Sequence, residues 1–331
     1  MHYKTPIFGH HVSNIIDLLE PNNLSELKRY ISKAKEESIT GFIGGPPCPD
    51  FSVAGKNKGK DGENGKLSGT YTTLICKTKP DFFLFENVKG LYRTSKHRAF
   101  FDTLKEHYKK AGYVMTEQLI NAIEYGVPQN RERIILIGVH KSLLNKLGIK
   151  YSNNELSSFN WDSHKVFNKN ILNANWPSVS PYNEDGSLEF PNGLPAELTI
   201  QYWWNKNDVD NHPNANMFFK PKAGIIKFKT IDEGDDKKKC YKRLHRWRYS
   251  PTAAYGNNEV HIHPYKPRRL SVAEALAIQS LPKEFVLPNN ISLTDAFKTI
   301  GNGVPFLAAR GIALSIYKFL NKSQYDNNRN I

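Results

Sequence analysis

A single cysteine in a stiff loop carries the clearest chemistry in this chain of 331 residues. Cys48 follows Gly44-Gly45-Pro46-Pro47, and the apolar run of residues 40–43 predicts a buried strand that ends in a tight loop. A thiol held at the carboxyl end of a strand, on a loop with little conformational freedom, suits a nucleophile. A free cysteine that packs as a small apolar side chain produces the same pattern. This stretch alone leaves both interpretations open.

Charged residues flank two further predicted strands. Glu86 follows the continuous apolar run of residues 81–85, and Arg131 and Arg133 precede the apolar run of residues 134–139. Because side chains alternate along a strand, two arginines spaced two apart point to the same face. The alternatives are a strand-end carboxylate that caps a loop and a pair of surface arginines at a sheet edge.

The elements that would position these residues follow from the spacing of apolar side chains. Helical spacing and apolar runs alternate up to about residue 145, which predicts an α/β fold with a doubly wound, Rossmann-like sheet. The expected helices are residues 23–37, 67–78 and 97–111, and the expected strands are residues 12–16, 40–43, 81–85, 114–122 and 134–139. The run at 81–85 is typical of a strand buried on both faces in a parallel sheet.

The texture of the sequence changes near residue 150. Residues 150–250 are rich in Asn, Pro, Trp, Tyr and Lys and have few periodic segments, which predicts a smaller, irregular second domain. Periodicity returns at Ser271, which with Glu274 forms a capping box for a helix to Leu281, and a last helix is expected at residues 304–319.

The charge favours a polyanionic partner. The chain carries 46 Lys and Arg against 32 Asp and Glu, a net charge of +14, and the excess concentrates between residues 205 and 269. Three cysteines without a CxxC motif indicate neither a disulfide framework nor a zinc site, and no stretch resembles a signal peptide or a membrane span. His261 and His263 lack suitably spaced partners for a metal. We expect a cytoplasmic protein.

Five short motifs together resemble the DNA cytosine-5 methyltransferases. They occur in that family's order and at compatible spacings: Pro46-Pro47-Cys48, Glu86-Asn87-Val88, Gln129-Asn130-Arg131-Glu132-Arg133, Arg268-Arg269-Leu270-Ser271 and Gly301-Asn302-Gly303-Val304-Pro305. The resemblance implies a catalytic domain at residues 1–149 and 265–331 and a target-recognition domain at residues 150–264. Trp203, Trp204, Lys206 and residues 237–239 are then candidate groove or phosphate contacts. Taken singly, each of them fits core packing or a solvated charge better.

The resemblance also implies roles for the catalytic residues. Cys48 attacks C6 of a cytosine that has been flipped out of double-stranded DNA, and Glu86 supplies a proton at N3, provided that burial raises its pKa. Arg133 holds the cytosine O2, and Arg131 supports the site. The methyl donor is S-adenosylmethionine, for which Pro47, Leu67, Asn302 and Val304 are the expected contacts.

The match is incomplete at its beginning and beside the cysteine. The family's glycine-rich cofactor turn and the acidic residue after its second strand are not found, so the four cofactor residues make about half a pocket. Pro49-Asp50 replaces the usual glutamine and small residue. We therefore weigh a split enzyme whose cofactor half is a second polypeptide, a truncated start, and an inactive homologue that only binds DNA. An RNA cytosine-5 methyltransferase is a further alternative.

Overall fold

The computed structural model describes residues 11–47, 63–220, 225–238, 240–253, 255 and 261–321. Cys48, Pro49 and Asp50 lie outside the described residues, as do residues 51–62. By packing, the chain divides into two compact units. Unit 1 comprises Met1–Ile120, Glu132–Trp161 and Ser315–Ile331, and unit 2 comprises Asn121–Arg131 and Asp162–Leu314. This division by packing differs from the expected functional one, because residues 265–314 group with the region after residue 162.

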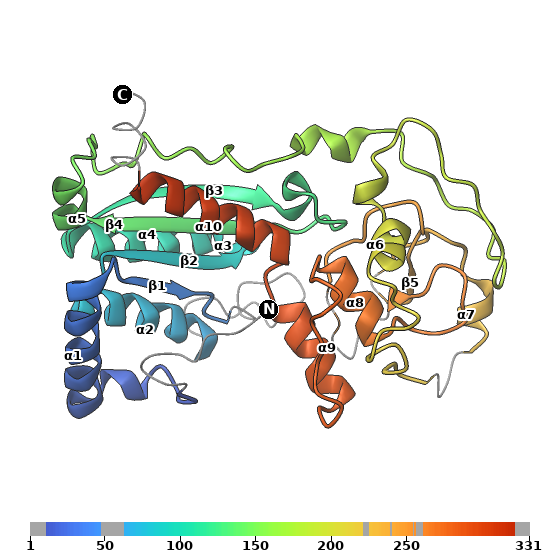
Figure 1. Ribbon diagram of the computed structural model, residues 1–331, viewed down its shortest axis with the longest axis horizontal. Helices are drawn as coiled ribbons and strands as arrows, with labels where there is room; N and C mark the ends of the chain where they lie inside the picture. Colours follow the sequence, from blue (N-terminus) through green and yellow to red (C-terminus); the bar gives the residue numbers. More distant parts are fainter. Residues whose placement is uncertain are drawn as a thin grey trace. The chain divides into compact units, whose positions relative to one another are not determined.

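Unit 1 is built on a four-stranded sheet with the order β1-β2-β4-β3 (Figure 1). Its strands are β1 (Gly41–Gly44), β2 (Phe82–Val88), β3 (Tyr113–Asn121) and β4 (Glu132–His140). β1 runs parallel to β2, whereas β4 is antiparallel to it. The expectation of a parallel sheet around residues 81–85 is therefore confirmed for the pairing with β1 and wrong for the pairing with β4, and the sheet is mixed. An apolar run reports burial but not direction, and β4 follows β3 after a connection too short for a crossover helix.

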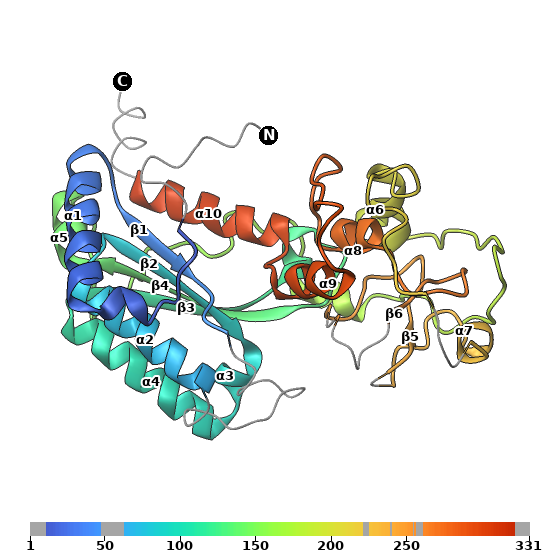
Figure 2. The same ribbon diagram turned by 90° about the horizontal axis from the view of Figure 1, so that it is seen from below.

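Helices cover this sheet and form the core of unit 1. They are α1 (Pro21–Glu37), α2 (Glu63–Thr78), α3 (Lys89–Arg93), α4 (Ser95–Lys110) and α5 (Lys141–Lys146). Figure 2 shows α2, α3 and α4 together on one face. Phe83 and Phe85 are fully buried there, and the Phe83 ring stacks on Tyr108 with centroids 4.1 Å apart. Because side chains alternate along β2, Leu84 and Glu86 point to the opposite face.

The strand expected at residues 12–16 is not present, and the short 3-10 helix η1 (Asp17–Leu19) follows instead. The Asn14 side chain accepts a hydrogen bond from the Ile16 amide (3.1 Å), and the Asp17 amide donates to the Asn14 carbonyl (3.0 Å). An asparagine that bonds to its own following backbone favours a turn over a strand. The prediction of a strand here was wrong for that reason.

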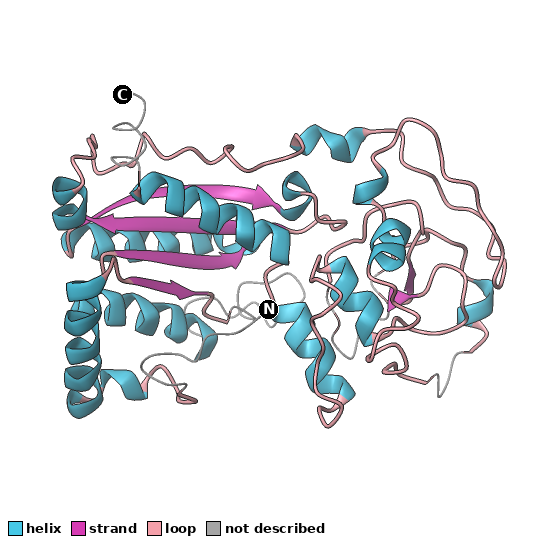
Figure 3. Ribbon diagram, in the orientation of Figure 1, coloured by secondary structure: helices cyan, strands magenta, loops and turns pink. Residues whose placement is uncertain are grey.

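Unit 2 consists largely of loops with short elements (Figure 3). These are the helices α6 (Ile200–Lys206), α7 (Lys227–Thr230), α8 (Val272–Ile278) and α9 (Leu293–Asn302), the two-stranded pair β5 (Lys242–Arg243) and β6 (His261–Ile262), and the 3-10 helices η4 (Ala122–Tyr125), η5 (Lys169–Asn173) and η6 (Ala196–Leu198). α10 (Phe306–Leu320) belongs to unit 2 up to Leu314 and to unit 1 beyond it. The irregular texture expected for residues 150–250 is confirmed.

The predicted capping box of α8 is confirmed, but the helix ends earlier than expected. Ser271 accepts from the Glu274 amide (3.2 Å), and the Glu274 carboxylate accepts from the Ser271 amide (2.8 Å). Ser280 adopts a positive φ of 56°. A residue in the left-handed region terminates a helix, so α8 stops at Ile278 and not at Leu281.

Trp203 and Trp204 are core residues of unit 2 and not the exposed groove contacts that the sequence suggested. Their exposed fractions are 5% and 2%. Each indole N–H donates to a main-chain carbonyl, Trp203 to Glu197 (2.8 Å) and Trp204 to Glu274 (3.2 Å). Apolar bodies with satisfied donors serve packing. We exclude both from direct DNA contact.

Among the described residues, the stretch Leu293–Leu320 is long and apolar enough to cross a membrane by length and composition alone. The stretch consists of two helices, α9 and α10, and Phe297, Ile300 and Ile312 on them are buried in the protein. Core helices of soluble proteins share this composition.

Candidate active site

Glu86 and Arg133 form an ion pair on one face of the unit 1 sheet. The Arg133 Nε lies 3.0 Å from a Glu86 carboxylate oxygen, with only 14% and 16% of the two side chains exposed. The register of β2 and β4 places Ile135 opposite Glu86 and Arg133 opposite Val88, so the pair is a diagonal one. The expected proton donor and the expected donor to the cytosine O2 are therefore direct neighbours on this face.

The loop that leads to Cys48 packs against this pair. A Cβ on Gly45 would lie 2.7 Å from the second Glu86 carboxylate oxygen, so a side chain at this position would displace the Glu86 carboxylate from where it lies. The Asn87 amide, 2% exposed, donates to the Pro46 carbonyl (3.4 Å) and accepts from the Val88 amide (2.9 Å). Asn87 therefore links the end of β2 to the loop, two residues before the cysteine. The sequence pattern indicated no separate role for Gly45 or Asn87.

Arg131 has partners quite different from those of Arg133. It belongs to unit 2, is 2% exposed, and precedes β4. Its guanidinium donates to the carbonyls of Gly301 (2.9 Å), Gly303 (3.1 Å) and Ala253 (3.3 Å). Although the two arginines are two residues apart in the sequence, they therefore bind different partners. Arg131 holds the turn that carries Asn302.

Replacing Arg131 with alanine is expected to lower the free energy of unfolding by roughly 3 kcal/mol, because three main-chain carbonyls lose a charged donor whose own side chain is buried. Urea denaturation measures this change, and hydrogen exchange of the amides at residues 301–304 is expected to quicken. Arg131→Lys recovers only part of the loss, because one ammonium cannot replace the guanidinium fork. The control is Arg310→Ala, at an exposed arginine of α10, for which about 0.5 kcal/mol or less is expected. Equal effects of both alanine variants would refute the structural role of Arg131.

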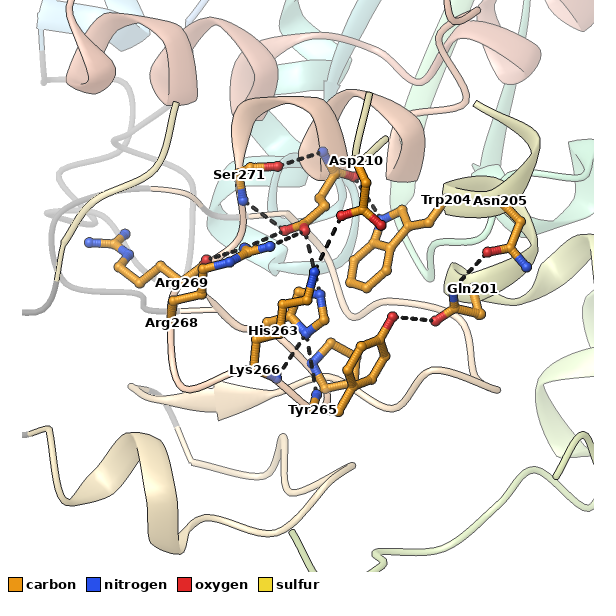
Figure 4. A network of polar contacts seen from close by, with 12 residues as sticks. Gln201, Trp204, Asn205, Asp210, His263, Tyr265, Lys266, Arg268, Arg269 and Ser271 are labelled. Carbon is orange, nitrogen blue, oxygen red and sulfur yellow. Dashed lines mark hydrogen bonds and ion pairs between the residues drawn. The ribbon is translucent and has the colours of Figure 1, made fainter. Parts of the chain in front are cut away.

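The Arg268–Ser271 motif forms a buried ionic network in unit 2 (Figure 4). The Arg268 guanidinium donates to both oxygens of the Glu274 carboxylate (2.6 and 2.9 Å). His263 Nδ1 accepts from the Tyr265 and Lys266 amides, so its Nε2 carries the proton that faces Glu274 at 3.4 Å. Burial alone would raise the pKa of Glu274, but His263 and Arg268 outweigh it and hold that pKa below its ordinary value.

The charged side chains of this network are paired with one another and with the start of α8. Within the described parts of the chain, no group of three or more His, Cys, Asp or Glu side chains could hold a metal ion. His261 in β6 lies buried beside the Tyr255 ring, with ring centroids 5.4 Å apart. His261 is therefore packed in the core, and His263 contacts the Glu274 carboxylate that caps α8.

A family model described as C-5 cytosine-specific DNA methylase matches residues 13–318. The chain belongs to this family. It is 59% identical over 321 residues to the Type II methyltransferase M.NmeDI of Neisseria meningitidis serogroup C, an alignment that covers 97% of this chain and 74% of that protein. It is 30% identical over 318 residues to the Type II methyltransferase M.NgoPII of Neisseria gonorrhoeae, an alignment that covers 88% of this chain and 82% of that protein.

Solved structures show the same fold at low sequence identity. A prophage-encoded protein of Escherichia coli superimposes with a TM-score of 0.62 and 23% identity, covering 95% of this chain and 87% of that one. The methyltransferase EhMeth of Entamoeba histolytica superimposes with a TM-score of 0.54 and 12% identity, covering 96% of this chain and 84% of that one. The expected α/β methyltransferase fold is thereby confirmed.

C-5 cytosine-specific DNA methylases use S-adenosylmethionine as the methyl donor, and this chain is an enzyme of that class. The four expected cofactor residues fit only part of that molecule. Pro47 is exposed after β1 and Leu67 is half-buried in α2, both in unit 1, whereas Asn302 and Val304 belong to unit 2. They offer apolar surface and one amide, and they include no carboxylate for the ribose hydroxyls. We therefore derive the chemistry only for the residues that this chain supplies.

Proposed function

We propose that this chain is the catalytic and target-recognition portion of a Type II DNA cytosine-5 methyltransferase, acting in the cytoplasm within a restriction–modification system. The observation that carries the proposal is the Glu86–Arg133 pair beside the loop to Cys48. Its relatives M.NmeDI and M.NgoPII are named Type II methyltransferases. Residues 150–264 are assigned to target recognition.

The proposed mechanism uses three side chains around a flipped cytosine. The Cys48 thiolate adds to C6, and the electron pair of the C5–C6 bond moves into the ring. A proton held between N3 and Glu86 offsets the negative charge that develops there. Arg133 donates to O2, so the incoming base takes over a donor that in this structure faces Glu86. This exchange removes the cation from Glu86 and so favours its protonation. When bound, S-adenosylmethionine would supply the methyl group that C5 of the adduct takes up and would leave as S-adenosylhomocysteine. Loss of the C5 proton to solvent then restores the C5–C6 double bond, and the C6–S bond breaks to release the Cys48 thiolate.

A second polypeptide is proposed to complete the cofactor side of the sheet. β1 pairs with β2 along one edge and stands last in the order of the described strands, and Ile43 on it is 72% exposed. Beside it lies a groove of about 890 Å³ between β1 and α1, whose apolar wall includes Leu27 and Phe42. An edge strand with apolar surroundings is a ready template for an added strand.

Transfer of labelled methyl from S-adenosylmethionine to mixed-sequence duplex DNA tests both proposals. We expect transfer when the chain is mixed with the product of the adjacent upstream reading frame, and Ile43→Lys is expected to lower that activity at least about tenfold, because the ammonium would be buried under an added strand. Val286→Lys, at an exposed apolar residue of unit 2, is the matched control and should change little.

Two outcomes count against parts of this scheme. Full activity of the chain alone would eliminate the second polypeptide and leave the enzyme proposal standing. If neither the chain nor the mixture transfers methyl groups, and duplex binding is retained, the result would favour a homologue that binds DNA but catalyses no methyl transfer.

A further inference from the structure

The helical turn at α7 in unit 2 exposes two adjacent isoleucines. Ile225 and Ile226 are 56% and 73% exposed, and residues 227, 229 and 230 are exposed as well. Only Phe228 of this turn is buried, at 3% exposure, with its ring against the edge of Tyr241 at 5.8 Å. Packing of the turn thus needs Phe228 but neither isoleucine.

The turn is nevertheless held firmly. Its backbone closes on itself, since the Phe228 amide donates to the Ile225 carbonyl (3.0 Å) and the Lys229 amide to the Ile226 carbonyl (2.9 Å). Arg243, with 0% of its surface exposed, donates to the carbonyls of Phe228 and Ile231, the latter at 2.7 Å. A buried cation with its fork on main-chain carbonyls fixes the backbone it binds.

Arg243 ties this turn to the rest of unit 2. It also donates to the His263 carbonyl at 2.6 Å, and its guanidinium lies 3.9 Å from the centroid of the Tyr182 ring. Burial lowers the pKa of Arg243 to about 10, which leaves it charged at neutral pH. The exposed isoleucines are therefore presented on an anchored turn, and Figures 1 and 2 both place α7 at the periphery of its unit.

Two lysines on the same turn indicate what would cover it. The Lys227 Nζ lies 4.7 Å from the centroid of the Tyr241 ring. The Lys229 Nζ lies 3.8 Å from a Glu184 carboxylate oxygen, and the side chains of Lys229 and Glu184 are each about half exposed. Lysines directly after an apolar tip suit the sugar-phosphate backbone at the edge of a DNA groove. Apolar side chains read thymine methyl groups in the major groove or wedge between base steps.

We propose that the turn of residues 225–230 is a DNA-reading element in which Ile225 and Ile226 contact base edges and Lys227 and Lys229 contact phosphates. The inference rests on the proposed function, because it names part of the surface that recognises the target duplex. Protein partners would also bury isoleucines, but the adjacent lysines favour the polyanion.

The test is selection of duplexes by the full chain from a random-sequence pool, followed by sequencing of the bound fraction. Ile225→Ala and Ile226→Ala are expected to relax the base preference at one or two positions by roughly 5- to 150-fold while leaving other positions unchanged. Lys229→Ala should weaken binding of all duplexes alike and reduce its salt dependence. Val286→Ala, at another exposed apolar residue, is the control and should behave as wild type.

Failure of this inference is distinguishable from failure of the proposed function. If the wild-type chain selects a sequence and both isoleucine variants select it equally well, the DNA-reading role is refuted. If the wild-type chain binds no duplex at all, the proposed function falls, and this inference falls with it. A change in the oligomeric mass of the isoleucine variants, with DNA preference intact, would assign the surface to a protein partner. Unaltered thermal midpoints verify that the variants fold.

Discussion

Cys48→Ser is expected to abolish methyl transfer, by at least about 10³-fold, while the affinity for duplex DNA stays within about twofold of wild type. The reason is chemical, because a serine hydroxyl at neutral pH is a far weaker nucleophile than a thiolate and cannot add to C6. Labelled methyl transfer and a duplex-binding titration, both under the conditions in which the wild-type protein is active, measure the two quantities.

The other two cysteines supply matched controls for this experiment. Cys76 is half-buried on α2, where burial raises the pKa of its thiol, and Cys240 is exposed in unit 2. Serine at either position should leave transfer largely unchanged. Covalent capture by duplexes containing 5-fluorocytosine, in the presence of methyl donor, should fail for Cys48→Ser alone. Retained transfer by that variant would remove Cys48 from the mechanism.

Arg133→Ala is expected to lower the turnover number by roughly 10²- to 10³-fold and to change duplex affinity much less. The variant removes the donor assigned to the cytosine O2 and the cation that lies 3.0 Å from Glu86. Arg133→Lys should recover only part of the activity, because it restores the charge but not the planar fork. Single-turnover kinetics separate the chemical step from binding.

Arg93 offers a control of the same residue type on the same unit. It pairs with Glu132 at 3.3 Å, and 57% of its side chain is exposed. Arg93→Ala should alter turnover by no more than about threefold, because exposed ion pairs contribute little. Equal losses of turnover and affinity in Arg133→Ala would instead identify Arg133 as a phosphate contact.

Local pattern was sufficient for most elements of unit 1. The apolar runs at residues 40–43, 81–85 and 134–139 lie within β1, β2 and β4 or meet them to within one residue, because alternation and burial leave a direct trace in residue types. Asn14 shows where pattern failed, since its side chain competes for the backbone that a strand would use. α9 was not expected at all, although its Ala296, Phe297 and Ile300 are buried at helical spacing.

The candidate site was predictable in its members and less so in their contacts. Glu86 and Arg133 were expected to act together and are paired, whereas Arg131 was expected beside them and instead binds three carbonyls of unit 2. Spacing along a strand predicts the face of a side chain only while the strand continues, and β4 begins at Glu132. For Trp203 and Trp204 the sequence left groove contact and core packing both open, because an aromatic residue looks alike in sequence whether it stacks on a base or fills a core. Their burial decides for the core.

The residue types and the order of the five motifs were enough to predict the family and the side chains that its chemistry requires, because covalent reactivity and charge belong to the side chains themselves. Only the tertiary structure decided the antiparallel direction of β4, the partners of Arg131 and the exposure of Ile43, Ile225 and Ile226. Direction, partnership and exposure arise from segments far apart in the chain, such as Arg131 and Gly301 or Phe228 and Arg243. Those contacts depend on how the whole chain packs, and no local pattern of residues encodes them.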